Sequence, residues 1–240
     1  MGDDGELTRD SILRGRLCLW QPRDGYRFSI DPLLLVDFVR PPYGRVVDFC
    51  AGCGVVGLGL MTRDPAAQAT LVELQDRLAT LARRNAEDNA MGARVVVHHG
   101  DLRTAPRDAG AAYDVAVANP PYRTLDEGPA SPDEEVAIAQ HELRVTLAEV
   151  AAAMRRALAP GGRAALVYPA ARVAALLAAL DGAGLRPLRA RFVHPRAEEP
   201  ANRVLVEAHK GARGPLVVEA PLVVRDAAGY TAEAARLLGD

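Results

Sequence analysis

The chain has 240 residues, of which 49% are hydrophobic and 25% are charged, a composition typical of a globular protein with a sizeable core. Its net charge is -2 and its pI is about 6.2, which excludes a strong overall attraction to polyanions, so a nucleic-acid partner must be bound by a local basic patch. The sequence has no apolar run of about 18 residues, which excludes a transmembrane helix.

Cysteine usage and the N-terminal residues predict a cytoplasmic protein. The first residues, MGDDGELTRDS, are polar and acidic, unlike a signal peptide. The three cysteines are an odd number, and two of them lie together in CAGC at 50–53, so they do not form a disulfide framework. CAGC lacks a second pair of ligands at zinc spacing, and we therefore expect no metal site.

Residues 1–44 precede the first predicted core strand and are expected to form an N-terminal segment that packs on the core. They end in a short apolar helix, for which Asp31 is the expected N-cap and Pro32 the first helical position. Phe28, just before this helix, is a candidate cover for the mouth of the site and equally a candidate core residue.

From residue 45 onward, short β-branched runs alternate with longer helical stretches, which predicts an α/β fold with a parallel sheet covered on both faces. The last two strands have no helix between them, so the last strand is expected to be antiparallel. We predict a doubly wound, seven-stranded, mostly parallel sheet formed by one domain at 45–210, with 211–240 as its C-terminal extension. The expected strands are 45–49, 69–74, 93–100, 113–119, 162–169, 188–195 and 202–210, and the expected helices are 54–63, 75–90, 141–158 and 170–184.

A glycine-rich turn follows the first predicted core strand in DFCAGCGVVGLGL. Gly52, Gly54 and Gly57 satisfy the pattern G-x-G-x-x-G, which brings backbone N–H groups close to a ligand at the carboxyl edge of a sheet. The turn lacks the Lys-Ser/Thr ending of a phosphate loop. By itself, the motif leaves the choice between nucleotide cofactors open.

Acidic residues at the ends of the first three core strands narrow that choice. They are Asp48, Glu73 and Asp101, and the carboxyl ends of parallel strands meet at one crevice. A dinucleotide site uses the second acid for a ribose but gives no reason for the third. A cofactor with an amino-acid tail, a sulfonium and an adenosine accounts for all three, which indicates S-adenosylmethionine (SAM).

The fourth strand ends in the tetrapeptide Asn119-Pro120-Pro121-Tyr122. The exocyclic amine of a nucleobase is a poor nucleophile because its lone pair is delocalised into the ring. The Asn119 side-chain oxygen and the Pro120 carbonyl can each accept one N–H of such an amine, while the prolines fix the direction of that carbonyl. Tyr122 offers a flat face for stacking. The tetrapeptide therefore predicts methylation of a planar amino group.

The chain resembles the class I SAM-dependent amino-methyltransferases, whose [N/D]-P-P-[Y/F] motif follows the fourth strand. It is similar over nearly its whole length to bacterial enzymes that methylate N6 of adenine 37 in tRNA, through GYRFSIDPLLLVDF, DEEVAIAQHE, HPRAEEPANRVLVEAHKG and PLVVEAPLVVRDAAGYTAEAARLL. This resemblance implies a Rossmann-like fold, SAM as cofactor and RNA as partner, with the anticodon loop of a tRNA as the substrate. Cys50 departs from the family, which has the first glycine of the loop there.

Carried over by this resemblance, Asn119, Pro120, Pro121 and Tyr122 are the expected catalytic residues. The expected cofactor-binding residues are Phe28, Asp48, Cys50, Ala51, Gly52, Gly54, Glu73, Leu74, Gly100, Asp101, Leu102 and Asn119. The stretch 186–213 has seven basic residues against three acidic ones, and Arg123, Arg196 and Arg203 are candidate RNA contacts.

Other functions stay open on the sequence alone. A ribosomal-RNA base amino-methyltransferase or a glutamine-amide protein methyltransferase uses the same tetrapeptide, although the latter group carries a sizeable helical N-terminal domain. A secondary-metabolite methyltransferase would not explain the whole-chain resemblance. A non-catalytic RNA-binding module would not need the intact tetrapeptide.

Overall fold

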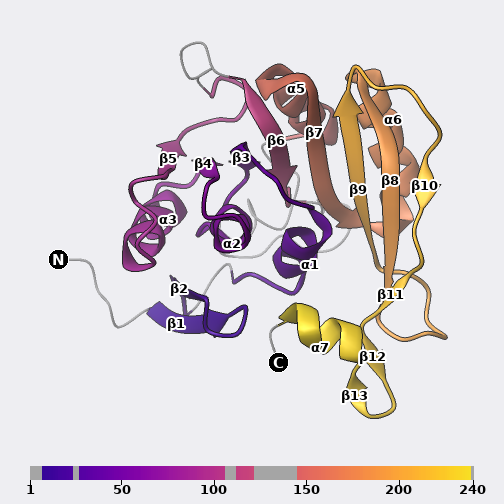
Figure 1. Cartoon of the computed structure of the whole chain (residues 1–240), viewed down its shortest axis with the longest axis horizontal. Coiled ribbons are helices and arrows are strands. Elements are labelled where there is room, and N and C mark those ends of the chain that lie inside the picture. The colour runs from indigo at the N-terminus through magenta and orange to yellow at the C-terminus, as the bar shows by residue number, and fades with distance from the viewer. Residues whose placement is uncertain (1–6, 24–26, 106–111, 122–144, 239–240) are drawn as a thin grey trace.

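The computed structural model describes residues 7–23, 27–105, 112–121 and 145–238. Its central sheet has seven long strands in the order β5-β4-β3-β6-β7-β9-β8, extended at β8 by the short strands β10 and β11 (Figure 1). The long strands are β3 (Arg45–Phe49), β4 (Gln68–Glu73), β5 (Val95–His99), β6 (Tyr113–Ala118), β7 (Leu158–Pro169), β8 (Leu185–His194) and β9 (Arg203–Lys210).

The predicted α/β class and strand directions are confirmed. Strands β5, β4, β3, β6 and β7 run parallel, whereas β9 is antiparallel to both of its neighbours, β7 and β8. Strands β10 (Val217–Val218) and β11 (Leu222–Val223) pair parallel to β8 and were not expected from the sequence. They add the C-terminal extension to the edge of the sheet.

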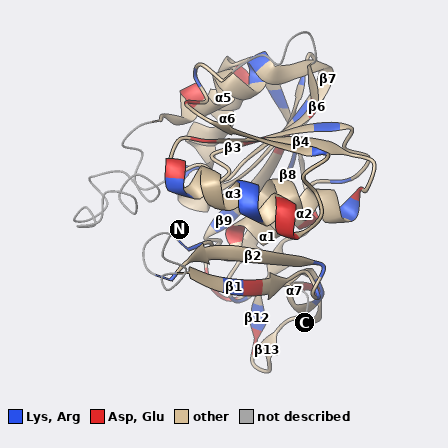
Figure 2. Ribbon diagram, turned by 90° about the vertical axis from the view of Figure 1, so that its left-hand side faces the viewer, with Lys and Arg blue, Asp and Glu red and all other residues tan. Residues whose placement is uncertain are grey.

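Helices cover both faces of the sheet, with α1–α3 on one side and α5–α6 on the other (Figure 2). Side chains of successive strand residues enter opposite cores: Val115 and Val117 join the core of α1–α3, while Ala116 and Ala118 join the core of α5–α6. The helices are α1 (Asp31–Phe38), α2 (Val55–Arg63), α3 (Asp76–Asp88), α5 (Leu147–Ala157) and α6 (Val173–Gly182), the last preceded by the 3-10 turn η3 (Ala170–Arg172). None of the described helices is long and apolar enough to cross a membrane.

An N-terminal hairpin, which the sequence did not predict, lies beneath α2 and α3 (Figures 1 and 2). It consists of β1 (Leu7–Ile12) and β2 (Leu17–Pro22), paired antiparallel. The tight connection between them places Leu13, Arg14 and Gly15 at positive φ. Leu17 and Leu19 are fully buried, so one face of β2 belongs to the core.

The expected N-cap role of Asp31 is wrong. Helix α1 begins at Asp31 itself, its cap residue is Ile30, and no side chain caps it. The Asp31 carboxylate is 2% exposed and accepts a hydrogen bond from Arg203 Nε at 2.8 Å. A buried carboxylate is stabilised far more by a paired guanidinium than by the dipole of a short helix, and the ion pair therefore decides its orientation.

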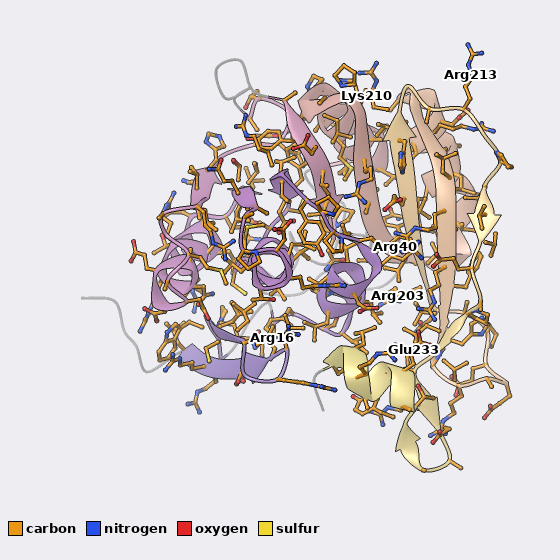
Figure 3. All side chains as sticks on the ribbon, in the orientation of Figure 1. Arg16, Arg40, Arg203, Lys210, Arg213 and Glu233 are labelled. Atoms are coloured by element: carbon orange, nitrogen blue, oxygen red, sulfur yellow. The ribbon has the colours of Figure 1, made fainter. Side chains whose placement is uncertain are left out.

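The tail after β9 crosses back toward α1 and ends in β12 (Arg225–Asp226), β13 (Gly229–Tyr230) and the short helix α7 (Ala232–Leu238). Glu219 binds Arg40 at 2.7 Å, and Glu233 binds Arg191 at 2.8 Å. Figure 3 shows Arg40 beside α1 and Glu233 on α7, at two ends of this connection. Ion pairs thus tie the tail to the sheet and to α1.

Candidate active site

A pocket opens at the carboxyl ends of β3, β4, β5 and β6, where the sequence placed the site. It holds about 660 Å³ of atom-free space, its open mouth included. The lining residues are Cys50, Gly52, Val72, Glu73, Leu74, Gln75, Leu78, Gly100, Asp101, Leu102, Asn119, Pro121 and Val145.

The glycine turn between β3 and α2 passes close to the underlying strands. Gly54 has φ +95°, and a Cβ at Gly57 would lie 2.1 Å from Leu71 Cδ2. Glycine suits the backbone conformation at position 54, and at position 57 any larger residue would force the buried Leu71 side chain to move. Cys50 has φ +59°, a value that suits glycine, and this is the position where the resemblance expected one.

Glu73 braces this turn from the end of β4. Its Oε2 accepts from the Gly52 amide at 2.8 Å, and its Oε1 accepts from the Gln75 amide at 2.9 Å. Burial raises the pKa of the Glu73 carboxyl, while these backbone N–H groups lower it. Each oxygen has capacity for a further hydrogen bond, so the carboxylate can accept from a ligand hydroxyl in the pocket.

Asp48 lies beneath the turn and is not among the lining residues. It is 1% exposed, its Oδ2 accepts from the Gly57 amide at 2.8 Å, and its Oδ1 has no hydrogen-bond partner in the described structure. Burial raises its pKa to about 8, with a smaller contribution from Glu73, against the lowering effect of the Gly57 amide. A nearby cation would favour its ionised form.

Asp101 reaches the pocket, but Arg103 holds it. The Arg103 Nε lies 3.0 and 2.9 Å from the two Asp101 carboxylate oxygens, and the Arg103 amide donates to Oδ1 at 2.8 Å. The hydrogen bonds from the Arg103 side chain lower the pKa of Asp101. Arg103 also lies 3.3 Å from Glu149 at the start of α5. Asp101 therefore stays ionised at neutral pH.

Asn119 follows β6 directly and lines the pocket together with Pro121. Its side-chain Oδ1 is buried and has no hydrogen-bond partner in the described structure. An unpartnered buried acceptor costs free energy unless a ligand satisfies it. Pro120 is buried between the two lining residues, whereas Tyr122 and Arg123 lie outside the described residues.

Eight of the twelve expected cofactor-binding residues line this pocket, and Phe28, Asp48, Ala51 and Gly54 do not. Phe28 packs against the core formed by α1–α3. Sequence reasoning missed Val72, Gln75, Leu78 and Val145, which also line the pocket. Val72 is next to Glu73, Gln75 and Leu78 lie at the start of α3, and Val145 comes just before α5. These positions near the ends of strands and helices were the signals that could have indicated a place in the pocket. Gln75 Oε1 is a further buried acceptor without a partner there.

The two cysteines of CAGC differ in their surroundings. Cys50 lines the pocket, whereas Cys53 is buried and burial raises its pKa to about 12. Within the described part of the chain, no group of three His, Cys, Asp or Glu side chains is arranged to hold a metal ion.

The doubly wound sheet with its antiparallel β9, the glycine turn and the acids at the strand ends define a class I SAM-dependent methyltransferase. A family model described as "Methyltransferase small domain" matches residues 30–172, and the chain belongs to this family.

The chain is also similar to individual proteins and solved structures that are named as methyltransferases. The tRNA1(Val) (adenine(37)-N6)-methyltransferase of Aeromonas hydrophila is 34% identical over 168 residues, which cover 70% of this chain and 69% of the relative. The 4-amino-L-phenylalanine/4-methylamino-L-phenylalanine methyltransferase of Streptomyces pristinaespiralis is 33% identical over 75% of this chain and 56% of its own length. The crystal structure of a predicted O-methyltransferase from Agrobacterium tumefaciens superposes with a TM-score of 0.69 at 28% identity, covering 86% of this chain and 94% of the other.

Proposed function

We propose that this methyltransferase transfers a methyl group to the N6 amino group of an adenine in RNA, at position 37 of a tRNA. The observation that carries the proposal is the buried Oδ1 of Asn119 at the wall of the SAM pocket, which has no hydrogen-bond partner among the described residues. The name of the Aeromonas hydrophila relative, which shares 34% identity, supports the choice of substrate. An adenine in a single-stranded loop can present its amino group, whereas a paired adenine cannot.

The pocket residues fit SAM. Glu73 would accept hydrogen bonds from the ribose hydroxyls, and the apolar side chains of Val72, Leu78 and Leu102 would hold the adenine ring. Asp48, whose Oδ1 lacks a partner, would stabilise positive charge above the turn. The backbone of the glycine turn would contact the cofactor through Cys50, Ala51, Gly52 and Gly54. The pocket is also lined by Leu74, Gly100 and Asp101, and Phe28 packs against the core beside it.

SAM supplies an electrophilic methyl group bonded to a sulfonium. The Asn119 Oδ1 and the Pro120 carbonyl would each accept one N–H of the substrate amine, which turns its lone pair toward the methyl group. Tyr122 would stack on the base. Neither Asn119 nor Pro120 is a base, so the proton that the amine loses as the N–C bond forms passes to solvent. Catalysis would consist of orientation and electrostatic complementarity.

A second candidate substrate is a free aromatic amine. It is favoured by the 33% identity to the Streptomyces pristinaespiralis methyltransferase, which is named for an aminophenylalanine. The same Asn119 acceptor would orient the amine of an aniline ring. The two candidates differ in what lies outside the pocket, because only an RNA needs a surface for phosphates.

A basic groove supports the choice of RNA as the substrate. It is lined by Arg14 and Arg16 at the hairpin tip, Arg63 at the end of α2 and Arg236 on α7, with Asp37 as the one acidic lining residue. The lining side chains therefore carry an excess of three positive charges. Figure 3 shows Arg16 at the hairpin, facing α7. An RNA stem that leaves the pocket along the hairpin would place phosphates here.

The arginines expected from the sequence are engaged elsewhere. Arg203 binds Asp31, and Arg196 donates to the Asp226 carbonyl at 3.1 Å and lies 3.7 Å from Glu199. The groove arginines also have partners, since Arg63 lies 3.8 Å from Asp37 and Arg236 lies 4.0 Å from Glu233. We assign the phosphate-binding role to the groove because four arginines cluster there against one acidic lining residue. A tRNA substrate also implies a cytoplasmic protein.

The test compares methyl transfer from labelled SAM to unmodified tRNA with transfer to 4-amino-L-phenylalanine. We expect label on tRNA adenine and none on the free amino acid. Label on the amino acid alone would replace the RNA proposal by the second candidate.

A further inference from the structure

Asn85 on α3 and Asn89 at the C-terminal cap of the same helix form hydrogen bonds with the backbone of β2, as a neighbouring strand would. Asn85 Oδ1 accepts from the Trp20 amide at 2.7 Å, and Asn85 Nδ2 donates to the Trp20 carbonyl at 3.0 Å. One helical turn later, Asn89 does the same for Cys18, at 3.0 and 2.6 Å. The exposed backbone edge of the hairpin is thereby satisfied by side-chain amides.

The second N–H of each side-chain amide donates to a different acceptor. Asn85 Nδ2 also donates to the Cys53 carbonyl, at 2.9 Å, in the glycine turn that forms the wall of the SAM pocket. Asn89 Nδ2 donates instead to the Asn85 carbonyl of its own helix, at 2.7 Å. Asn85 therefore links the hairpin to the turn, whereas Asn89 links the hairpin to α3 alone.

The position of Asn85 makes this link rigid. Its side chain is fully buried, and its three polar contacts satisfy the amide oxygen once and both amide hydrogens. The turn that it holds is also held from the other side, where Gly52 donates to Glu73. No hairpin residue is among the described residues that line the pocket, so an effect of the hairpin on the cofactor must pass through residues that contact both the hairpin and the pocket wall, and Asn85 is one of them.

We propose that Asn85 is a positioning residue for the cofactor: it fixes the Cys53 carbonyl, and with it the glycine turn, so that docking of the hairpin and binding of SAM stabilise each other. The proposal rests on the cofactor and is independent of the methyl acceptor. It gives the N-terminal hairpin a role in SAM affinity without any contact with SAM.

Asn89 supplies the matched control. The variants N85A and N89A each remove two hydrogen bonds to β2 on the same helix, but only N85A leaves the Cys53 carbonyl unpaired. By isothermal titration calorimetry with SAM and S-adenosylhomocysteine, we expect N85A to raise Kd about tenfold and N89A to change it less than about twofold. Amides of residues 50–57 should exchange hydrogen faster in N85A and at the wild-type rate in N89A.

A second measurement needs no variant, and so it covers the case in which N85A does not fold. Coupling is reciprocal, so saturation of the wild-type protein with SAM should slow exchange of the Trp20 amide, which binds Asn85, more than that of the Cys18 amide. Equal effects of N85A and N89A on Kd, or no protection of the Trp20 amide by SAM, would overturn the proposal and leave Asn85 as an anchor of the hairpin only. Neither result would bear on the choice between RNA and a free amine.

Discussion

The Glu73 carboxylate and the Gly52 amide are joined by a 2.8 Å hydrogen bond that ties the end of β4 to the glycine turn after β3. One side chain thus shapes the turn and lines the pocket that the turn forms. The carboxylate holds the turn, and in the proposed function its remaining acceptor capacity binds the cofactor. Loss of the charge should therefore weaken cofactor binding in two ways.

The substitution E73Q keeps the size of the side chain but turns an N–H group toward one of the two backbone amides. Because hydrogen bonds to charged groups contribute about 1.5–3 kcal/mol, we expect the Kd for SAM to rise about 10- to 100-fold. Calorimetry measures this directly. The matched control is E87Q, an exposed position on α3, which should bind SAM as the wild type does. Unchanged affinity in E73Q would show that Glu73 does not contact the cofactor.

Asp48 predicts a pH dependence of SAM binding. Burial raises its pKa to about 8, so the carboxyl is largely protonated at pH 6 in the free protein. A bound sulfonium favours the carboxylate, and binding then releases a proton. The Kd should fall as pH rises from 6 to 8, by at most about tenfold per unit. Calorimetry in buffers of different ionisation enthalpy detects the released proton.

The variant D48N has no proton to release and should lose this dependence. The raised pKa also sets the sign of a stability effect: between pH 4 and 8 the folded state holds a proton that the unfolded state has lost, so this group's contribution to the free energy of unfolding falls as pH rises. D48N should therefore be more stable than the wild type at pH 8. An unchanged Kd for the wild type across this pH range would contradict the assignment.

Asn119 should affect transfer and leave cofactor binding nearly intact. In N119A the amine loses one of its two acceptors, and we expect kcat to fall at least about 100-fold, as for loss of other orienting hydrogen bonds in active sites. The Kd for SAM should change less than about threefold. Single-turnover kinetics separates the chemical step from binding. N119A with wild-type kcat would show that the unpartnered Oδ1 is not used in catalysis.

The basic groove predicts a salt-dependent contribution to RNA affinity. The double variant R16A/R236A removes two exposed guanidinium groups. It should weaken tRNA binding several-fold and lower the slope of log K against log salt by about two. Fluorescence anisotropy over a salt series measures both quantities. The control R196A, outside the groove, should leave the slope unchanged. An equal loss of tRNA affinity in R196A would contradict the assignment of phosphate binding to the groove.

The parallel strands and the pocket edge could be predicted from the sequence because their signals are local. Strand β3 was predicted with its bounds, and Asn119 and Glu73 were placed at strand ends because each follows a continuous apolar run. The hairpin was missed because its stabilising partners are distant: Trp20 binds Asn85, 65 positions away. No local pattern in residues 7–22 encodes that contact.

The wrongly predicted roles of Asp31 and Arg203 also result from contacts between residues that are distant in the sequence. Asp31 and Arg203 each have a locally plausible role, as a helix cap and as a phosphate contact, but the fold brings them together across 172 positions. Asp101 was correctly placed near the pocket, whereas its bond to Arg103 depends on a turn conformation that residue types alone do not specify. Long-range ion pairs thus override local preferences where burial is high.

Nucleoside mass spectrometry of a defined tRNA transcript after reaction with SAM tests the central claim most directly. We predict N6-methyladenosine at position 37 with the wild-type protein and none with N119A, although both bind SAM. Methylation at another atom or another base, or an unmodified tRNA alongside a methylated free aromatic amine, would contradict it.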